Sequence, residues 1–145
     1  METTKRLEIS SALAGLAGII LTVSGLFLPW GSMIQSYYKE VLIPLNGLQA
    51  NYALTGIYAV VALCIEIFGF FLLIAGTRKA ASAILAAAAS FMIIQAVMWL
   101  MKIRPVPFSY PIAHIENIGP YATLIGSSFI ILTALLSLLQ LRLSS

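Results

Sequence analysis

Four long runs of apolar residues dominate this chain, and the termini and the shorter segments between the runs hold all but one of its charged side chains. The runs cover about residues 9–30, 53–75, 80–101 and 121–141. Each is long enough to cross a hydrocarbon core of about 30 Å, which takes about 20 helical residues. None alternates apolar and polar residues as barrel strands do. The pattern predicts an all-α membrane protein, one domain of four transmembrane helices in an antiparallel up-down bundle.

The composition indicates that lipid, and not water or nucleic acid, surrounds the chain. Hydrophobic residues make up 61% of the 145 residues and charged residues 9%, whereas soluble domains carry about 25% charged residues. Such a surface would aggregate in water, so we expect the chain to lie in a lipid bilayer. The net charge of +3 is scattered, without the basic stripe of a nucleic-acid-binding protein. Cys64 is the only cysteine, which excludes an intrachain disulfide.

The basic residues indicate an orientation. Four spans place both termini on one side, together with the turn at residues 76–79. That side would hold Lys5, Arg6, Arg78, Lys79 and Arg142, against Lys39, Lys102 and Arg104 on the other. The positive-inside rule then predicts a cell-membrane protein with cytoplasmic N- and C-termini and two outer loops, about residues 31–52 and 102–120.

The two outer loops differ in character. The first carries an apolar strip and the turn signal Pro44-Leu45-Asn46-Gly47, which fits either a short hairpin or an interfacial helix. The second carries four prolines, which predict a stiff, extended path and no regular helix. We expect an aromatic belt at the outer membrane surface, formed by Trp30, Tyr52, Trp99 and Tyr121.

A shift of 69 residues superposes Trp30 on Trp99 and Tyr52 on Tyr121. Each half of the chain would then be one helical hairpin with an outer loop. This is a hypothesis of a tandem repeat, related by an axis along the membrane normal. Glu66 has no counterpart under the shift, which brings it to Leu135.

Small residues mark the expected helix contacts. Lipid tails give no hydrophobic gain on helix association, so membrane helices pack where small side chains allow close approach. The residues that we expect at these contacts are Gly15, Gly18, Gly25, Gly69, Ala86 and Gly126.

Glu66 is the one charged side chain in the middle of an apolar run. It lies 14 residues after Tyr52 and 12 before Arg78, hence about 18–21 Å from either end of its helix. A carboxyl group there costs about 2.5–3.5 kcal/mol on insertion scales. No Lys, Arg or His lies in a span, so we expect a neutral acid. Residues expected at its depth could bond to it: Ser90, Thr133, Ser137 and Thr22.

Three interpretations of Glu66 stay open at this point. It could be a structural acid that is bonded within the chain, it could pair with a polar or basic group of another subunit, or it could bind a proton or cation in transport. We expect no catalytic residue, metal site or cofactor. His114 and Glu116 alone do not make a metal site.

The sequence therefore favours a non-catalytic accessory or assembly subunit of a larger membrane complex. Its expected partners are other membrane subunits or further copies of itself. The alternative is a small oligomeric transporter or channel that uses Glu66 as its proton or cation site.

Overall fold

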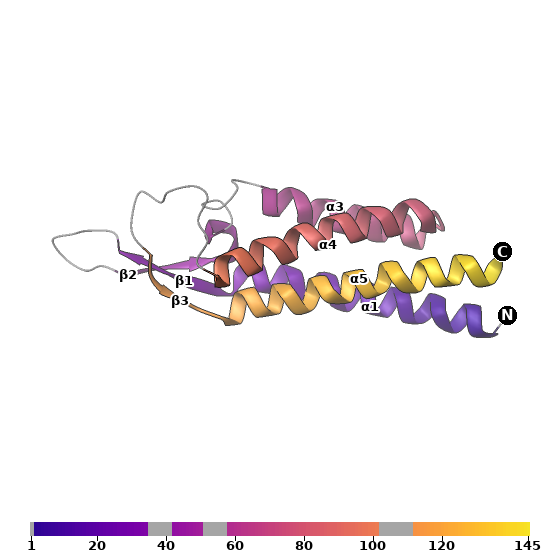
Figure 1. Cartoon of the computed structure of the whole chain (residues 1–145), viewed down its shortest axis with the longest axis horizontal. Coiled ribbons are helices and arrows are strands. Elements are labelled where there is room, and N and C mark those ends of the chain that lie inside the picture. Colours follow the sequence, from indigo (N-terminus) through magenta and orange to yellow (C-terminus); the bar gives the residue numbers. More distant parts are fainter. Residues whose placement is uncertain (1, 35–41, 51–57, 102–111) are drawn as a thin grey trace.

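The computed structural model is mostly helical and describes residues 2–34, 42–50, 58–101 and 112–145 (Figure 1). Helices α1 (Glu2–Phe27), α3 (Tyr58–Ile74), α4 (Arg78–Leu100) and α5 (Ile118–Ser144) run side by side along the long axis of the molecule. Both termini lie at one end, which we call the inner end. A small sheet of strands β1 (Pro29–Ile34), β2 (Leu42–Asn46) and β3 (Ile112–Ile115) lies at the other, the outer end.

Three of the helices, α1, α4 and α5, are long and apolar enough to cross a membrane. The fourth, α3, is apolar but has only 17 residues, and residues 53–57 of the span expected there lie outside the described residues. The first helix begins at Glu2 rather than near residue 9, and it ends at Phe27. It stops there because Pro29 disfavours the helical conformation in the residue before it. Trp30 therefore lies in strand β1 and not in a helix.

The sheet decides between the two structures expected for the first outer loop. Strand β1 is central and pairs antiparallel with β2 on one side and with β3 on the other. Residues 29–34 thus pair with residues 42–46, and residues 47–50 form a helical turn. Pro44 is tolerated because β2 is an edge strand, where one row of backbone groups needs no ladder partner.

The second outer loop contributes β3, but its last proline does not act as expected. Pro105, Pro107 and Pro111 lie outside the described residues. Pro120 lies in the first turn of α5, which begins at Ile118. Expecting no helix there was wrong, because the N–H groups of a first turn have no intrahelical partner and a proline loses nothing by lacking one.

The inner ends of α3 and α4 are joined by a tight turn. Gly76 has a φ of +93°, a conformation that side chains disfavour, and the Thr77 N–H donates to the Leu72 carbonyl at 3.1 Å. This six-residue closure is a Schellman motif, which satisfies carbonyls at the end of α3. Nearby, Arg78 forms an ion pair with Glu8 of α1 at 3.1 Å.

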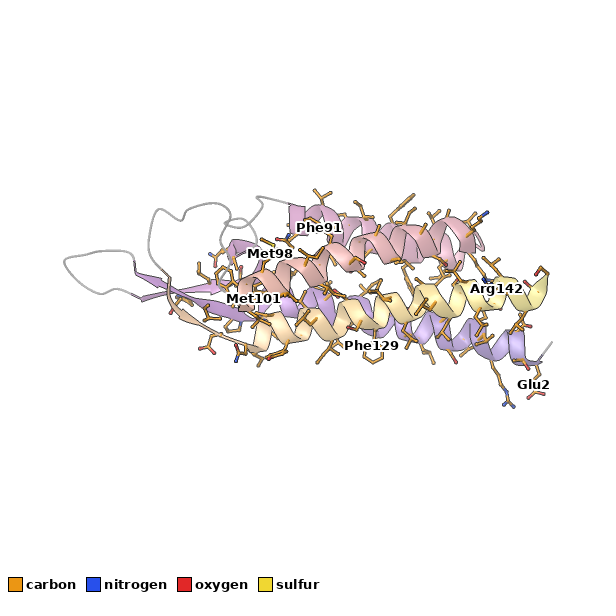
Figure 2. All side chains as sticks on the ribbon, in the orientation of Figure 1. Glu2, Phe91, Met98, Met101, Phe129 and Arg142 are labelled. Carbon is orange, nitrogen blue, oxygen red and sulfur yellow. The ribbon has the colours of Figure 1, made fainter. Side chains whose placement is uncertain are left out.

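The closest helix packing is between α1 and α5, where glycines bring two backbones together. A Cβ atom added to Gly18 would lie 2.8 Å from the Gly126 carbonyl oxygen, and one added to Gly126 would lie 2.6 Å from the Thr22 backbone nitrogen. Gly25 is equally tight against Thr123. Between α3 and α4, a Cβ atom added to Gly69 would lie 3.0–3.1 Å from the side chains of Leu85 and Ile84. The outward side chains are large and apolar, as Phe129 illustrates in Figure 2.

Candidate functional site

Glu66 lies on the buried side of α3, with no exposed surface. The buried positions of this helix recur every three or four residues, as expected for a helix with one packed face: Ala59, Ala62, Glu66, Gly69 and Leu73. The neighbours of Glu66 in this series are small or apolar. Glu66 is also the only charged residue in the described part of α3.

Neither carboxyl oxygen of Glu66 has a hydrogen-bond partner among the described residues. A buried polar group without a partner is unfavourable by about 1–3 kcal/mol, and most buried polar groups in folded proteins are satisfied. Among the described residues, Glu66 is therefore the one residue of a charged type that is buried without a hydrogen bond.

The four expected partners do not bond to Glu66. Thr22, Ser90 and Thr133 each donate to the backbone carbonyl four residues earlier, at 2.7–2.9 Å. Such back-bonding is common for hydroxyl residues inside helices. Ser90 is exposed, and the buried Ser137 hydroxyl has no partner among the described residues.

The position of Glu66 along the bundle axis explains in part why the expected partners do not bond to it. A Cβ atom added to Gly15 would lie 2.7 Å from Phe70 and 3.2 Å from Thr133, so these two residues are level with each other. Glu66 precedes Phe70 by four residues and lies about one turn nearer the outer end. Its level on α5 is therefore close to Phe129, about one turn from Thr133 and two from Ser137.

The depth expected from the sequence assumed that Tyr52 and Tyr121 are level. The offset between Phe70 and Thr133 instead makes Tyr58 level with Tyr121. A count from the ends of apolar runs therefore placed the acid too close to the inner end.

One buried hydroxyl residue of α5, Ser127, lies closer to the level of Glu66 than Thr133 and Ser137 do, and Thr123 lies about one turn further toward the outer end. Ser127 and Thr123 are fully buried, and their hydroxyl oxygens lack hydrogen-bond partners among the described residues. The sequence analysis did not select either residue as a partner of Glu66. Their spacing of three or four residues from Gly119, Gly126 and Ile130 was the available signal, because it places them on the packed face of α5.

A groove lies beside the acid, between α3 and α4. It has a volume of about 430 Å³ and is lined by Val61, Ala62, Ile65, Ala87, Ala88 and Phe91. Figure 2 shows Phe91 between these two helices. Ala62 is one turn from Glu66 on the same buried stripe, and small alanine side chains leave the space that forms the groove.

The outer end contains a second group of buried polar atoms, and here both indole N–H groups are bonded within the chain. The Trp30 indole N–H donates to the Gly25 carbonyl at 2.7 Å, and the Trp99 indole N–H donates to the Trp30 carbonyl at 2.6 Å. The two rings meet edge to face with centroids 6.0 Å apart. Gly119 presses against the Trp30 ring, where a Cβ atom would lie 2.5 Å from the indole nitrogen.

This arrangement corrects the expected aromatic belt. Trp30 and Trp99 are fully buried inside the protein and do not face a lipid surface. They were assigned to the surface because the sequence alone does not distinguish an interfacial tryptophan from one buried beneath a sheet. Tyr121 is 53% exposed, and Tyr52 lies outside the described residues.

The two tryptophans also bear on the proposed repeat. Trp30 lies in a strand and Trp99 in a helix, so the local backbone is not repeated at the pair on which the shift depends most. The tandem repeat stays a prediction.

Among the residues that the structure describes, no three or more His, Cys, Asp or Glu side chains gather into a group that could hold a metal ion. No protein-family model, no curated protein and no solved structure matches the chain. The site must therefore be interpreted from its own geometry.

Proposed function

We propose that the protein is a non-catalytic, multi-pass subunit of a larger membrane complex, in which Glu66 pairs with a polar or basic group of a neighbouring subunit. In this proposal α3 is the fourth span, the protein lies in the cell membrane, and the termini are cytoplasmic. The observation that carries the proposal is the fully buried Glu66 carboxyl, which has no partner among the described residues. A carboxyl kept in such a place is usually paired or functional.

The position of α3 supports a partner from outside the chain. Its buried stripe packs on α4, and its opposite face carries large exposed apolar side chains: Val60, Val61, Ile65, Phe68, Phe71 and Ile74. The alanine-lined groove between α3 and α4 could accept a ridge of side chains from a neighbouring helix. Because Glu66 has no exposed surface, a polar residue on that helix would reach it where the α3–α4 contact opens next to Ala62.

The test is native mass spectrometry of the protein after gentle solubilisation from its own membrane. We expect a partner subunit or a second copy at fixed stoichiometry, retained in Glu66→Gln and lost in Glu66→Leu. Glutamine keeps hydrogen-bonding capacity, whereas leucine removes it. Ser128→Leu is the matched control, because it makes a similar change on the exposed face of α5 and should leave the complex intact. If Glu66→Leu retained the same complex, the proposal would be wrong.

A second function is favoured by a separate observation. Three buried hydroxyl groups on α5, those of Thr123, Ser127 and Ser137, also lack partners among the described residues. Hydroxyl groups with a membrane carboxyl can form a proton or cation path in an oligomeric transporter. In that case purified protein in liposomes would carry a proton or cation flux that Glu66→Gln abolishes without loss of assembly. Such a flux would replace the subunit proposal.

A further inference from the structure

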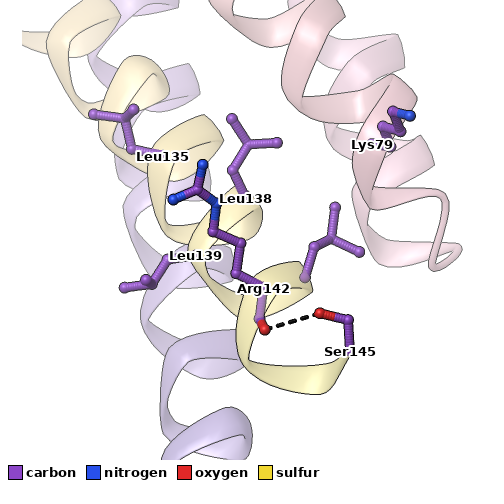
Figure 3. Close-up of a pocket in the computed structure, with 7 residues that line it drawn as sticks. Lys79, Leu135, Leu138, Leu139, Arg142 and Ser145 are labelled. Atoms are coloured by element: carbon purple, nitrogen blue, oxygen red, sulfur yellow. Dashed lines mark hydrogen bonds between the residues drawn. The ribbon is translucent and has the colours of Figure 1, made fainter.

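A hollow at the inner end lies between the start of α4 and the end of α5 (Figure 3). Its volume is about 560 Å³, and it is lined by Lys79, Leu135, Leu138, Leu139, Leu141, Arg142 and Ser145. Lys79 comes from the first turn of α4 and Arg142 from the last turn of α5. Two cations from helices far apart in the sequence therefore line one hollow together with four leucines.

Lys79 and Arg142 differ from Arg78 and Arg6 in having no acidic partner among the described residues. Arg78 pairs with Glu8, and Arg6 pairs with Glu2. Within the described part of the chain, neither Lys79 nor Arg142 forms an ion pair. Their positive charge is therefore available to an anion from outside the protein.

The residues that line the hollow lie at different depths along the bundle axis, which we take as the direction of the membrane normal. Leu135 precedes Arg142 by seven residues, which places it about 10 Å deeper toward the middle of the bundle. Figure 3 shows the Arg142 side chain extending back along α5 toward Leu138. The Arg142 guanidinium thus lies near the level of Leu138, and Leu135 lies about one turn deeper, where an acyl chain can reach it.

A second hollow adjoins the first. It shares Lys79 and Leu141 and is otherwise lined by residues of the inner turn and the first turns of α4: Gly76, Thr77, Arg78, Ala80 and Ala83. Lys79 therefore stands between two apolar depressions, which would let one headgroup at its ammonium group direct acyl chains to either side.

We propose that the Lys79–Arg142 hollow binds an anionic phospholipid. The phosphate accepts hydrogen bonds from the Lys79 ammonium and the Arg142 guanidinium, and an acyl chain lies on Leu135, Leu138 and Leu139. Basic pockets between membrane helices are typical sites for acidic lipid headgroups, and guanidinium groups suit phosphate oxygens. This proposal requires a bilayer around the bundle but does not depend on the partner of Glu66.

The test uses the full chain in nanodiscs of phosphatidylcholine with a minor fraction of phosphatidylglycerol. Native mass spectrometry after release counts the lipids that stay bound. We expect the wild type to retain phosphatidylglycerol, and K79Q/R142Q to bind it roughly tenfold or more weakly, since each cation near the surface contributes measurably to binding. Each single variant should give an intermediate loss.

The matched control is K5Q/R6Q, which removes two exposed cations of α1 at the same end and lowers the net charge equally. It should keep the bound lipid. Unchanged retention in K79Q/R142Q, or an equal loss in K5Q/R6Q, would overturn the proposal. Displacement of the lipid by millimolar inorganic phosphate would also overturn it, because the site would then recognise a free anion and not a lipid.

Discussion

The outer end and the α3–α4 hairpin bury polar groups in opposite ways. At the outer end the two indole N–H groups donate to backbone carbonyls, and the Trp30 carbonyl accepts from both the Trp99 indole and the Glu116 backbone N–H. In the hairpin, Glu66 is equally buried but neither of its oxygens is bonded among the described residues. The indole groups of the first region are therefore closed, meaning bonded within the chain, whereas the Glu66 carboxyl is open, meaning that it has no bond among the described residues.

This difference distinguishes buried polar groups that stabilise the fold from buried polar groups that can bind another molecule. A bonded group such as the Trp99 indole stabilises the fold and gives an outside molecule nothing to bind. An unbonded carboxyl destabilises the isolated chain, and in our proposal a neighbouring subunit supplies the missing bond. Each substitution below changes one of the two regions and tests whether it behaves as closed or open.

The largest effect should come from Trp30→Ala in the closed region. The ring is fully buried between Gly119 and the helical turn at Gly47, so its removal leaves a large cavity and an unbonded Gly25 carbonyl. We expect the free energy of unfolding in detergent to fall by about 3–5 kcal/mol. Tyr121→Ala removes another outer aromatic residue that is 53% exposed and should cost much less. Equal losses in the two variants would contradict the closed core.

The next largest effect should be seen when glycines of two helix pairs, α1–α5 and α3–α4, are compared. Gly126→Ala would bring a methyl group to 2.6 Å from the Thr22 backbone nitrogen, and neither backbone can move aside cheaply. We expect a loss of about 1–3 kcal/mol in the free energy of unfolding. Gly69→Ala meets only the Leu85 and Ile84 side chains at 3.0–3.1 Å. It should cost clearly less, because side chains can shift. A larger loss at Gly69 would show that the hairpin is the more rigid region.

A smaller change is expected for Trp99→Phe. Phenylalanine keeps most of the aromatic packing but removes the N–H that donates to the Trp30 carbonyl at 2.6 Å. That carbonyl still accepts from the Glu116 N–H at 3.1 Å, so it is not left unsatisfied. Unfolding measurements should therefore give a loss of about 1 kcal/mol. A loss as large as that of Trp30→Ala would show that the indole bond, and not the ring, maintains the outer end.

The two regions also differ in how far the sequence predicts them. Length and apolarity located three helices that are long enough to span a bilayer, together with the shorter apolar helix α3. The three-stranded sheet and the buried Trp30–Trp99 contact were not foreseen, since strand pairing and burial depend on residues brought together only in the fold. Glu66 was identified from its place in an apolar run, but its level relative to α5 was not. That level depends on how far each helix extends beyond its apolar run.

The smallest effect on stability, and the most informative, is expected for Glu66→Leu. If the carboxyl is unpaired in the isolated chain, replacing it with an apolar side chain of similar volume removes a buried polar group and breaks no bond. The free energy of unfolding should then stay within about 1 kcal/mol of the wild type, or rise. A loss of several kcal/mol would instead mean that Glu66 is bonded within its own chain, as Trp99 is, and that the hairpin is closed as well.

Stability and assembly together make this test decisive. If Glu66 is a structural acid, Glu66→Leu should reduce both stability and assembly. If Glu66 pairs with a partner, the same substitution should reduce assembly alone. Glu66→Gln completes the comparison, because the amide can still donate and accept hydrogen bonds at the same position. If the partner supplies a hydrogen-bonding group, the glutamine variant keeps the complex. If the partner supplies a cation, the complex weakens even with glutamine, because a charge-assisted bond is roughly twice as strong as a neutral one. The chemistry of the partner is thus measurable from this chain before the partner itself is identified.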